Sequence, residues 1–174
     1  AEKVDRAFRK EWKERTGQGE APRRISPRFL LVHSIAHALM RQLSLECGYS
    51  TASLRERLYV GEGDYDMAAL LVYTATPDSD GTLGGLARQG LPQRLATLIE
   101  GAVSSLQWCS SDPLCIKGIN ASTESLNRAA CHSCLLSPET SCEEFNRLLD
   151  RALLVGLPEA RDLSYFAGIG GPGT

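Results

Sequence analysis

Five of the six cysteines of this chain are gathered between residues 108 and 142, in a pattern typical of a metal site. Cys131 and Cys134 form a C-x-x-C pair, which lets one tight turn present two thiolates to a single ion. Cys109, Cys115 and Cys142 flank this pair and offer further thiolates. Zinc takes four such ligands in a tetrahedron, with sulfur at about 2.3 Å. The pattern therefore predicts one structural zinc ion held by thiolates.

Three other interpretations of these cysteines stay open: disulfides, buried free thiols and a redox motif. A redox C-x-x-C normally opens a helix after a strand, whereas here the motif follows a polar spacer and precedes a loop that contains proline. Zinc ligation by thiolates fits a reducing compartment, because disulfides do not persist there. No uncharged apolar run reaches 18 residues and no signal peptide is visible, so we expect a cytoplasmic protein.

Two histidines one helical turn apart are the second candidate for chemistry. His33 and His37 share one stripe of the helix predicted over residues 27–47, together with Arg41. Such a pair can chelate a metal. The zincin motif, however, requires glutamate directly after the first histidine, where this chain has Ser34. A ligand or partner site and simple hydrogen bonding inside the fold therefore both remain open for this stripe.

The elements that position these residues are predicted from apolar periodicity and from helix caps. We expect helices over 2–16, 27–47, 92–108 and 143–155, a short helix that contains Leu54, Arg55 and Glu56, and strands over 57–60 and 67–76. Residues 68–73 are apolar on both faces, which predicts a central, covered strand. The fold class is then α+β, a small sheet packed by several helices with the zinc site at one end.

The composition predicts one domain with an N-terminal arm. The chain has 174 residues, of which 43% are hydrophobic, so it can bury a core that does not depend wholly on the metal. Its formal net charge of -2 excludes a global attraction to nucleic acid and leaves room only for a local basic patch. The first residue is alanine rather than methionine, which is compatible with a piece of a longer protein.

Two polar segments offer further candidate sites. Arg23, Arg24 and Arg28 lie in and just after a linker where only Glu20 offsets their charge, so this run is either a site of phosphate contact or a solvated linker. The glycine-rich loop after the predicted strand carries Asp78, Ser79 and Asp80, yet it matches no nucleotide-binding motif.

Several stretches, taken in order, resemble the MrfA-like zinc-binding domain family. They are HSIAHALMRQLSLECGYSTASLRERLYV, LLVYTATPDSDGTLGGLARQG, WCSSDPLC, CHSC and ETSCEEFNRLLDRALLVG, and they cover about residues 28–157. Members of this family lie at the C-terminal end of a group of superfamily-2 DNA helicases and in the bacterial anti-phage system DISARM. The ECGYS-x-x-S-L-R-E-R and D-x-x-G-T-L-G-G-L stretches are most similar to the DISARM branch of the family.

The resemblance implies a domain division and a ligand set. Residues 1–26 would be an N-terminal helix and basic linker, 27–157 the zinc-binding domain and 158–174 a C-terminal tail. Zinc would be held by Cys131, Cys134 and Cys142 with one upstream thiolate. Of the two upstream candidates, Cys109 is favoured over Cys115, because Cys115 lies in an insertion relative to the helicase members.

Two function classes follow. In the first, the chain is a non-catalytic zinc module that associates with a superfamily-2 helicase and helps to bind DNA through Arg23, Arg24 and Arg28; the resemblance implies the helicase partner. No Walker A sequence and no D-E-x-H box is present, so the motor would be another chain or a missing part. In the second, His33, His37 and the loop from Asp78 to Asp80 form a metal-dependent hydrolase or nuclease. We favour the first, since no nucleophile–base pair can be named.

Overall fold

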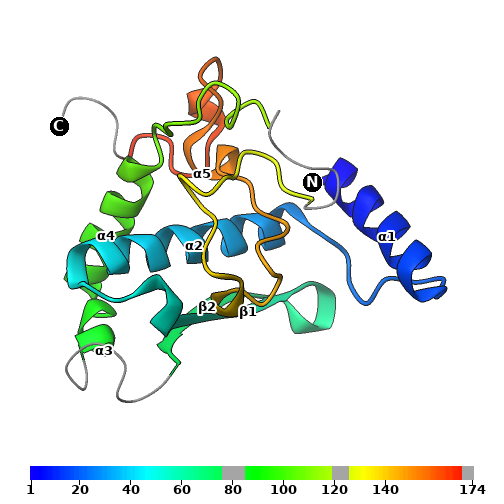
Figure 1. Cartoon of the computed structure of the whole chain (residues 1–174), viewed down its shortest axis with the longest axis horizontal. Coiled ribbons are helices and arrows are strands. Elements are labelled where there is room, and N and C mark those ends of the chain that lie inside the picture. Colours follow the sequence, from blue (N-terminus) through cyan, green and yellow to red (C-terminus); the bar gives the residue numbers. More distant parts are fainter. Residues whose placement is uncertain (76–84, 119–125, 170–174) are drawn as a thin grey trace.

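The computed structural model describes residues 1–75, 85–118 and 126–169. A long helix, α2 (Pro27–Cys47), runs through the middle of the molecule, with a β-hairpin on one side and the cysteine-rich loops on the other (Figure 1). Helices α4 (Pro92–Ser105) and α5 (Ala152–Val155) also contact α2. The loop from Asp78 to Asp80 lies outside the described residues. The expected α+β class is confirmed.

Helix α2 forms where the sequence predicts it. The Ser26 side chain accepts a hydrogen bond from the N–H of Phe29, and Pro27 occupies the first turn, where its missing N–H costs nothing. Gly48 ends the helix with a positive φ of 73°, a conformation that glycine adopts without strain. Between these caps almost the whole circumference is buried, as befits a helix packed on several sides.

The hairpin consists of β1 (Leu54–Gly61) and β2 (Met67–Thr74), which pair antiparallel with Leu54 opposite Thr74. Alternate residues of β1 face α2, so Leu54 is buried while Tyr59 on the outer face is exposed. The predicted short helix was wrong for residues 54–56, since only Thr51–Ser53 forms a 3₁₀ turn. The expected covered strand was wrong as well, because β2 packs on α2 with one face and leaves the other exposed.

The remaining elements are helical and short, apart from the first. They are α1 (Glu2–Thr16), α3 (Gly85–Gln89) and single 3₁₀ turns at Gly63–Tyr65, Glu139–Ser141 and Arg161–Leu163. The helix expected over 92–108 ends at Ser105. In the described part of the chain, no helix is both long and apolar enough to cross a bilayer.

The helix expected over 143–155 was wrong for most of its length, because only Ala152–Val155 is helical. Phe145, Asn146 and Leu148 have φ values of 52°, 60° and 63°, which no right-handed helix accommodates. The N–H of Asn146 donates to the sulfur of Cys142 and the N–H of Leu149 donates to a side chain, so these groups are diverted from helical bonds. Buried side chains at Leu148 and Leu149 explain why the apolar spacing imitates a helix.

Two hydrophobic clusters hold these elements together. The larger one joins α2, α4 and the cysteine loops around residues such as Leu43, Leu54 and Leu149. The smaller one fixes the N-terminal arm, because Val4 and Phe8 of α1 pack with Phe29 of α2. Part of the expected tail is also anchored, since the N–H of Tyr165 donates to the carbonyl of Leu153 at 3.0 Å.

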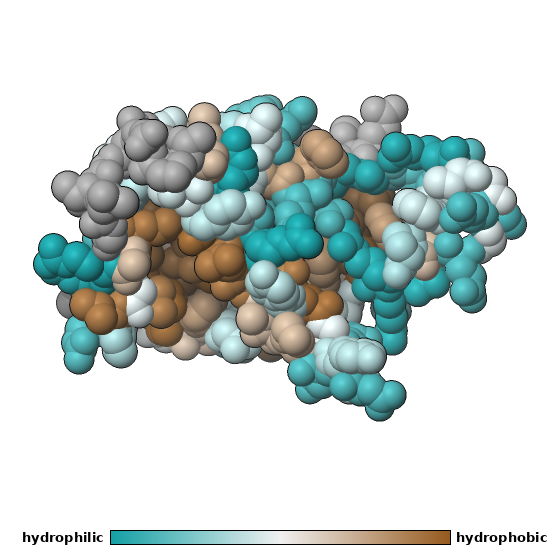
Figure 2. All heavy atoms as spheres, turned by 90° about the horizontal axis from the view of Figure 1, so that it is seen from below, coloured by the Kyte–Doolittle hydropathy of each residue, from teal (hydrophilic) through white to brown (hydrophobic). Residues whose placement is uncertain are grey.

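The underside of the molecule carries an apolar patch, left of centre in Figure 2, bordered by polar residues. On the outer face of the hairpin, Tyr59, Met67, Leu71 and Tyr73 are each more than 40% exposed. Beside it lies a groove of about 450 Å³, whose lining includes Leu31, Ile35, Leu70 and Phe166. Exposed apolar surface of this kind is typical of a contact with another protein surface.

The central role of α2 gives a stability prediction with a matched control on the same helix. Leu43 is 3% exposed and Leu45 is 67% exposed. Leu43→Ala leaves a cavity at the centre of the larger cluster, and we expect a loss of about 2–5 kcal/mol in the free energy of unfolding. Leu45→Ala should change it by less than about 0.5 kcal/mol. Urea unfolding of the two variants measures both values, and equal losses would contradict the described orientation of α2.

Candidate metal centre

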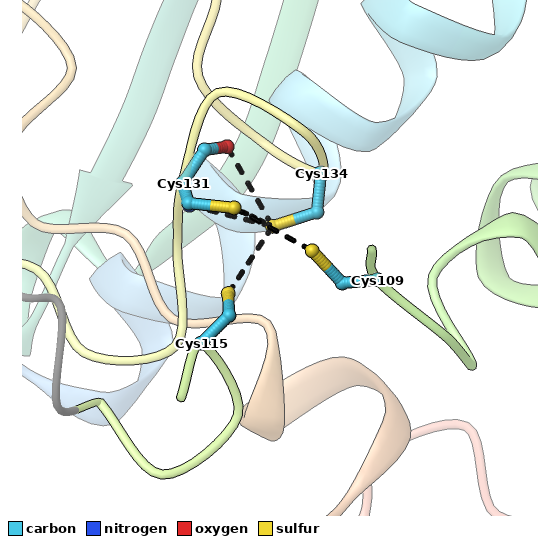
Figure 3. Close-up of side chains that lie close together, drawn as sticks. All are labelled: Cys109, Cys115, Cys131 and Cys134. Atoms are coloured by element: carbon cyan, nitrogen blue, oxygen red, sulfur yellow. Dashed lines mark hydrogen bonds between the residues drawn. The ribbon is translucent and has the colours of Figure 1, made fainter. Parts of the chain in front are cut away.

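Four cysteine sulfurs converge in the loops above α2 (Figure 3). They belong to Cys109, Cys115, Cys131 and Cys134, and all four lie within 4.8 Å of one another. The Sγ atoms of Cys109 and Cys131 are 3.5 Å apart, and Cys134 Sγ is 3.7 Å from both Cys115 Sγ and Cys131 Sγ. The four side chains come from two separate segments of the chain, so the cluster ties these segments together.

The spacing of the sulfurs fits a tetrahedral zinc site. With zinc–sulfur bonds of about 2.3 Å, neighbouring sulfurs of a tetrahedron lie about 3.8 Å apart. The observed separations are close to this value and far from the disulfide bond length of about 2.05 Å. All four thiols are free. The disulfide alternative therefore does not describe these residues, whereas four thiolates around one ion do.

The C-x-x-C pair sits in a tight turn, as expected for a zinc knuckle. The carbonyl of Cys131 accepts hydrogen bonds from the N–H groups of Cys134, Leu135 and Leu136 at 3.0–3.1 Å. In return, the N–H of Cys131 donates to Cys134 Sγ at 3.4 Å. Such N–H donors stabilise a charged sulfur and hold its direction. The turn thus aims both sulfurs at one point.

The upstream pair is held by Asp112. Its carboxylate accepts the N–H of Cys109 and the N–H of Ile116, both at 3.0 Å, and so closes the loop that carries Cys109 and Cys115. Arg151, which is fully buried, donates to Asp112 at 2.5 Å and to the carbonyl of Leu106 at 2.8 Å. This guanidinium brings positive charge beside a cluster of buried thiols.

The electrostatics of the cluster allow four thiolates only together with a cation. Burial raises the pKa of Cys134 to about 12, and burial with the neighbouring sulfurs raises the pKa of Cys115 further. Burial also raises the pKa of Cys131, but hydrogen bonds from neighbouring groups outweigh it and lower that pKa to about 7. Several buried thiolates therefore cannot coexist without a compensating charge. Zinc would supply that charge and would be held by all four sulfurs.

Two expectations about the ligands differ from this arrangement. Cys142 was expected to be a ligand together with Cys131 and Cys134, but it lies outside this cluster. Cys109 and Cys115 were expected to be alternatives, but both belong to the cluster, so Cys115 is the fourth member in place of Cys142. The physical reason is the attachment of the segment after Cys142 to strand β1. Glu143 accepts the N–H of Leu58 at 2.7 Å and forms an ion pair with Arg57 at 2.7 Å. These contacts hold Cys142 beside the hairpin, away from the zinc knuckle.

Cys142 instead joins a second buried cluster with His33, His37 and Glu56. The helical spacing of the two histidines predicts that they lie together, but Glu56 was not expected beside them, because residues 54–56 were predicted to be helical. The alternation of Leu54, Leu58 and Val60 was the available signal, since it places Glu56 on the core face of a strand. Arg41 is half-buried on the same helix and is not part of this cluster.

The three arginines of the linker have different environments. Arg23 forms an ion pair with Glu144 and stacks over the ring of Phe29 at 4.4 Å. Arg28 forms an ion pair with Asp66 and donates to the carbonyl of Gly61. Arg24 is exposed, and no ion pair of its side chain is found among the described residues. Much of the basic charge of this run is therefore already matched by carboxylates.

Comparison with known proteins agrees with the ligand geometry. The family model of the MrfA Zn-binding domain matches residues 35–135. Over 141 residues, which are 81% of this chain, the sequence is 40% identical to DISARM protein DrmB of Bacillus paralicheniformis. The matched region is 25% of that relative, so the chain spans about a quarter of its length. The family match ends at residue 135 and thus covers all four clustered cysteines but not Cys142.

The assignment of Cys115 gives the sharpest test of this site. Cys115→Ser removes one of four ligands, and we expect the loss of one equivalent of zinc and about 4 kcal/mol or more of folding free energy. Cys47→Ser is the matched control, because Cys47 lies in neither cluster. Elemental analysis and thermal unfolding measure the two effects. Unchanged zinc content in Cys115→Ser would show that Cys115 is a buried thiol and not a zinc ligand.

Proposed function

The chain belongs to the MrfA Zn-binding domain family, and from this premise we propose that it is a non-catalytic zinc module of a cytoplasmic anti-phage defence protein related to DrmB. The observation that carries the proposal is the 40% identity to DISARM protein DrmB across most of this chain. Its zinc would be structural, because four thiolates fill the tetrahedron and leave no position for a substrate or a water. The module would then act by binding partners.

We assign the protein contact to the apolar underside. The apolar residues on the outer face of the hairpin and in the groove beside it are the surface that we assign, and a superfamily-2 helicase partner is the occupant that we propose. Arg57, opposite Leu71, and Arg28, in the groove, add positive charge to this surface. Leu71 and Tyr73 belong to this surface, lie on β2 and are 48% and 42% exposed. Interfaces of this kind gain most of their free energy from a few aromatic and aliphatic side chains.

We assign DNA contact to the N-terminal arm. Arg24 is the residue of the linker best placed for a phosphate, because its charge is not consumed by an ion pair within the described chain. Exposed Lys3, Arg6 and Lys13 on α1 add to the same basic region. Contacts of this type go to phosphates rather than to base edges, so they hold DNA without reading its sequence.

The hydrolase alternative gains no support from the histidines. His33 and His37 are both 0% exposed, whereas a catalytic metal needs an open coordination position that a substrate can reach. Four protein groups surround the point between them, which closes that position. We therefore propose no reaction for this chain.

The DNA prediction concerns the full-length protein in complex with its helicase. Phosphate contacts release counterions, so affinity falls with salt by a slope of about 0.9 for each contact. Arg24→Gln should flatten this slope by about one contact's worth, and changing Arg23 and Arg28 as well should add little, since both are ion-paired. Arg88→Gln, an exposed arginine on α3, is the control. An unchanged slope in Arg24→Gln would remove DNA contact from the arm.

The partner prediction uses the apolar underside. Leu71→Asp places a negative charge on this surface without changing either cluster of metal-ligating groups, and we expect helicase binding to weaken roughly tenfold or more. Leu163→Asp is the control, because Leu163 is 81% exposed and lies outside the hairpin. Calorimetry with the purified helicase measures the affinity. Equal affinities for the two variants would place the contact elsewhere.

A further inference from the structure

The second buried cluster contains four groups that commonly bind metals, and the known family match does not account for it. His33 and His37 come from α2, Glu56 from β1 and Cys142 from the loop that follows the zinc knuckle. Their ligand atoms all lie within 4.8 Å of one another. His33, His37 and Glu56 are at most 2% exposed, and Cys142 is 5% exposed. Two imidazoles, a carboxylate and a thiol thus share one site without water access.

The distances match a tetrahedron of mixed ligands. His33 Nε2 lies 3.1 Å from Glu56 Oε1 and 3.2 Å from Cys142 Sγ, and His37 Nε2 lies 3.5 Å from Glu56 Oε1. In a tetrahedral zinc site with bonds of about 2.0–2.3 Å, such pairs of ligand atoms are about 3.3–3.6 Å apart. The observed separations therefore suit an ion at the centre.

The hydrogen bonds of His37 orient one nitrogen as a ligand. Its Nδ1 lies 2.8 Å from the carbonyl oxygen of Leu135, which can only accept, so the proton is on Nδ1. Nε2 then carries a lone pair, faces the Glu56 carboxylate and has no hydrogen-bond partner among the described residues. A lone pair directed at a buried carboxylate is repulsive, so either a second ring proton or a metal ion must lie between them. An N–H bonded to a backbone carbonyl is also the usual support of a metal-binding imidazole.

Two backbone N–H groups point at the sulfur of Cys142. It accepts N–H groups from Glu144 at 3.3 Å and from Asn146 at 3.2 Å. The same kind of donation reaches Cys109 Sγ from Ser111 in the four-cysteine cluster. A neutral thiol is a weak acceptor, whereas a thiolate accepts such bonds strongly. Two donors aimed at one buried sulfur would therefore stabilise the thiolate that a bound cation requires.

We propose that His33, His37, Glu56 and Cys142 bind a second zinc ion, in a closed structural site distinct from the four-cysteine centre. One carboxylate and one thiolate balance the two charges of the ion, so the filled site is neutral. The bound ion leaves the N–H of His33 Nδ1 without an acceptor among the described residues, a cost that is small beside the binding free energy of structural zinc. This inference does not depend on the proposed partners.

The second ion would fasten both ends of one segment. Residues 131–142 begin with the C-x-x-C turn of Cys131 and Cys134 and end at Cys142 beside β1. Between these ends, the carbonyl of Leu135 accepts a hydrogen bond from His37. An ion at each end would clamp this segment, which has only a single 3₁₀ turn, onto helix α2. The hairpin would be joined to the same helix through Glu56.

The metal content of the unmodified chain is the first test. Native mass spectrometry and elemental analysis of the 174-residue chain, purified without chelators, should give two zinc ions per chain. A single ion per chain, lost in Cys115→Ser, would overturn the proposal and leave a hydrogen-bonded network of His33, His37 and Glu56. This measurement needs no variant in the second cluster, so it does not depend on whether such a variant folds.

Two variants then locate the second ion. Glu56→Gln keeps hydrogen-bonding capacity but removes an anionic ligand, and Cys142→Ser removes the thiolate, so each should lower the zinc content from two ions to one. Cys47→Ser should keep both ions. With cobalt in place of zinc, the signal lost in Cys142→Ser should show charge transfer from one thiolate rather than four. Glu56→Gln with full metal content and an unchanged melting temperature would contradict the site.

Discussion

The convergence of four buried thiols on one point is the constraint on which the cysteine-rich loops depend. Four sulfurs lie together in loops with little regular structure, and burial raises the pKa of Cys115 and Cys134. Without a cation these thiols would stay protonated and make only weak contacts. With zinc they become four strong bonds that replace the backbone hydrogen bonds of a helix or sheet. Asp112 and Arg151 complete the arrangement, since one closes the upstream loop and the other supplies buried positive charge.

Helix α2 connects the cysteine-rich loops to the rest of the fold. It is buried on nearly all sides and contacts the hairpin, α4 and α5. His37 reaches from this helix to the carbonyl that follows Cys134, so the zinc knuckle and the core are directly connected. The same histidine faces Glu56 of the hairpin on its other side. The loops, the helix and the sheet therefore meet at one buried polar point, which we interpret as a second metal site.

Sequence reasoning succeeded where local signals and burial agree. Ser26, Pro27 and Gly48 mark the ends of α2, and the C-x-x-C pair marks the metal centre. It failed where tertiary contacts override local preference. The spacing of Leu148 and Leu149 imitates a helix, yet bonds to the sulfur of Cys142 and to side chains hold the backbone at positive φ. Cys142 was grouped with its neighbours in sequence, whereas ion pairs and hydrogen bonds of Glu143 bind it to the hairpin.

Anomalous diffraction at the zinc absorption edge, from a crystal of the metal-loaded chain, tests the central claim most directly, because it locates each ion without any mutation. We predict a strong peak equidistant from the sulfurs of Cys109, Cys115, Cys131 and Cys134, and a second peak between His33, His37, Glu56 and Cys142. A zinc peak bonded to Cys142 together with Cys131 and Cys134, or no peak among the four clustered sulfurs, would contradict the account.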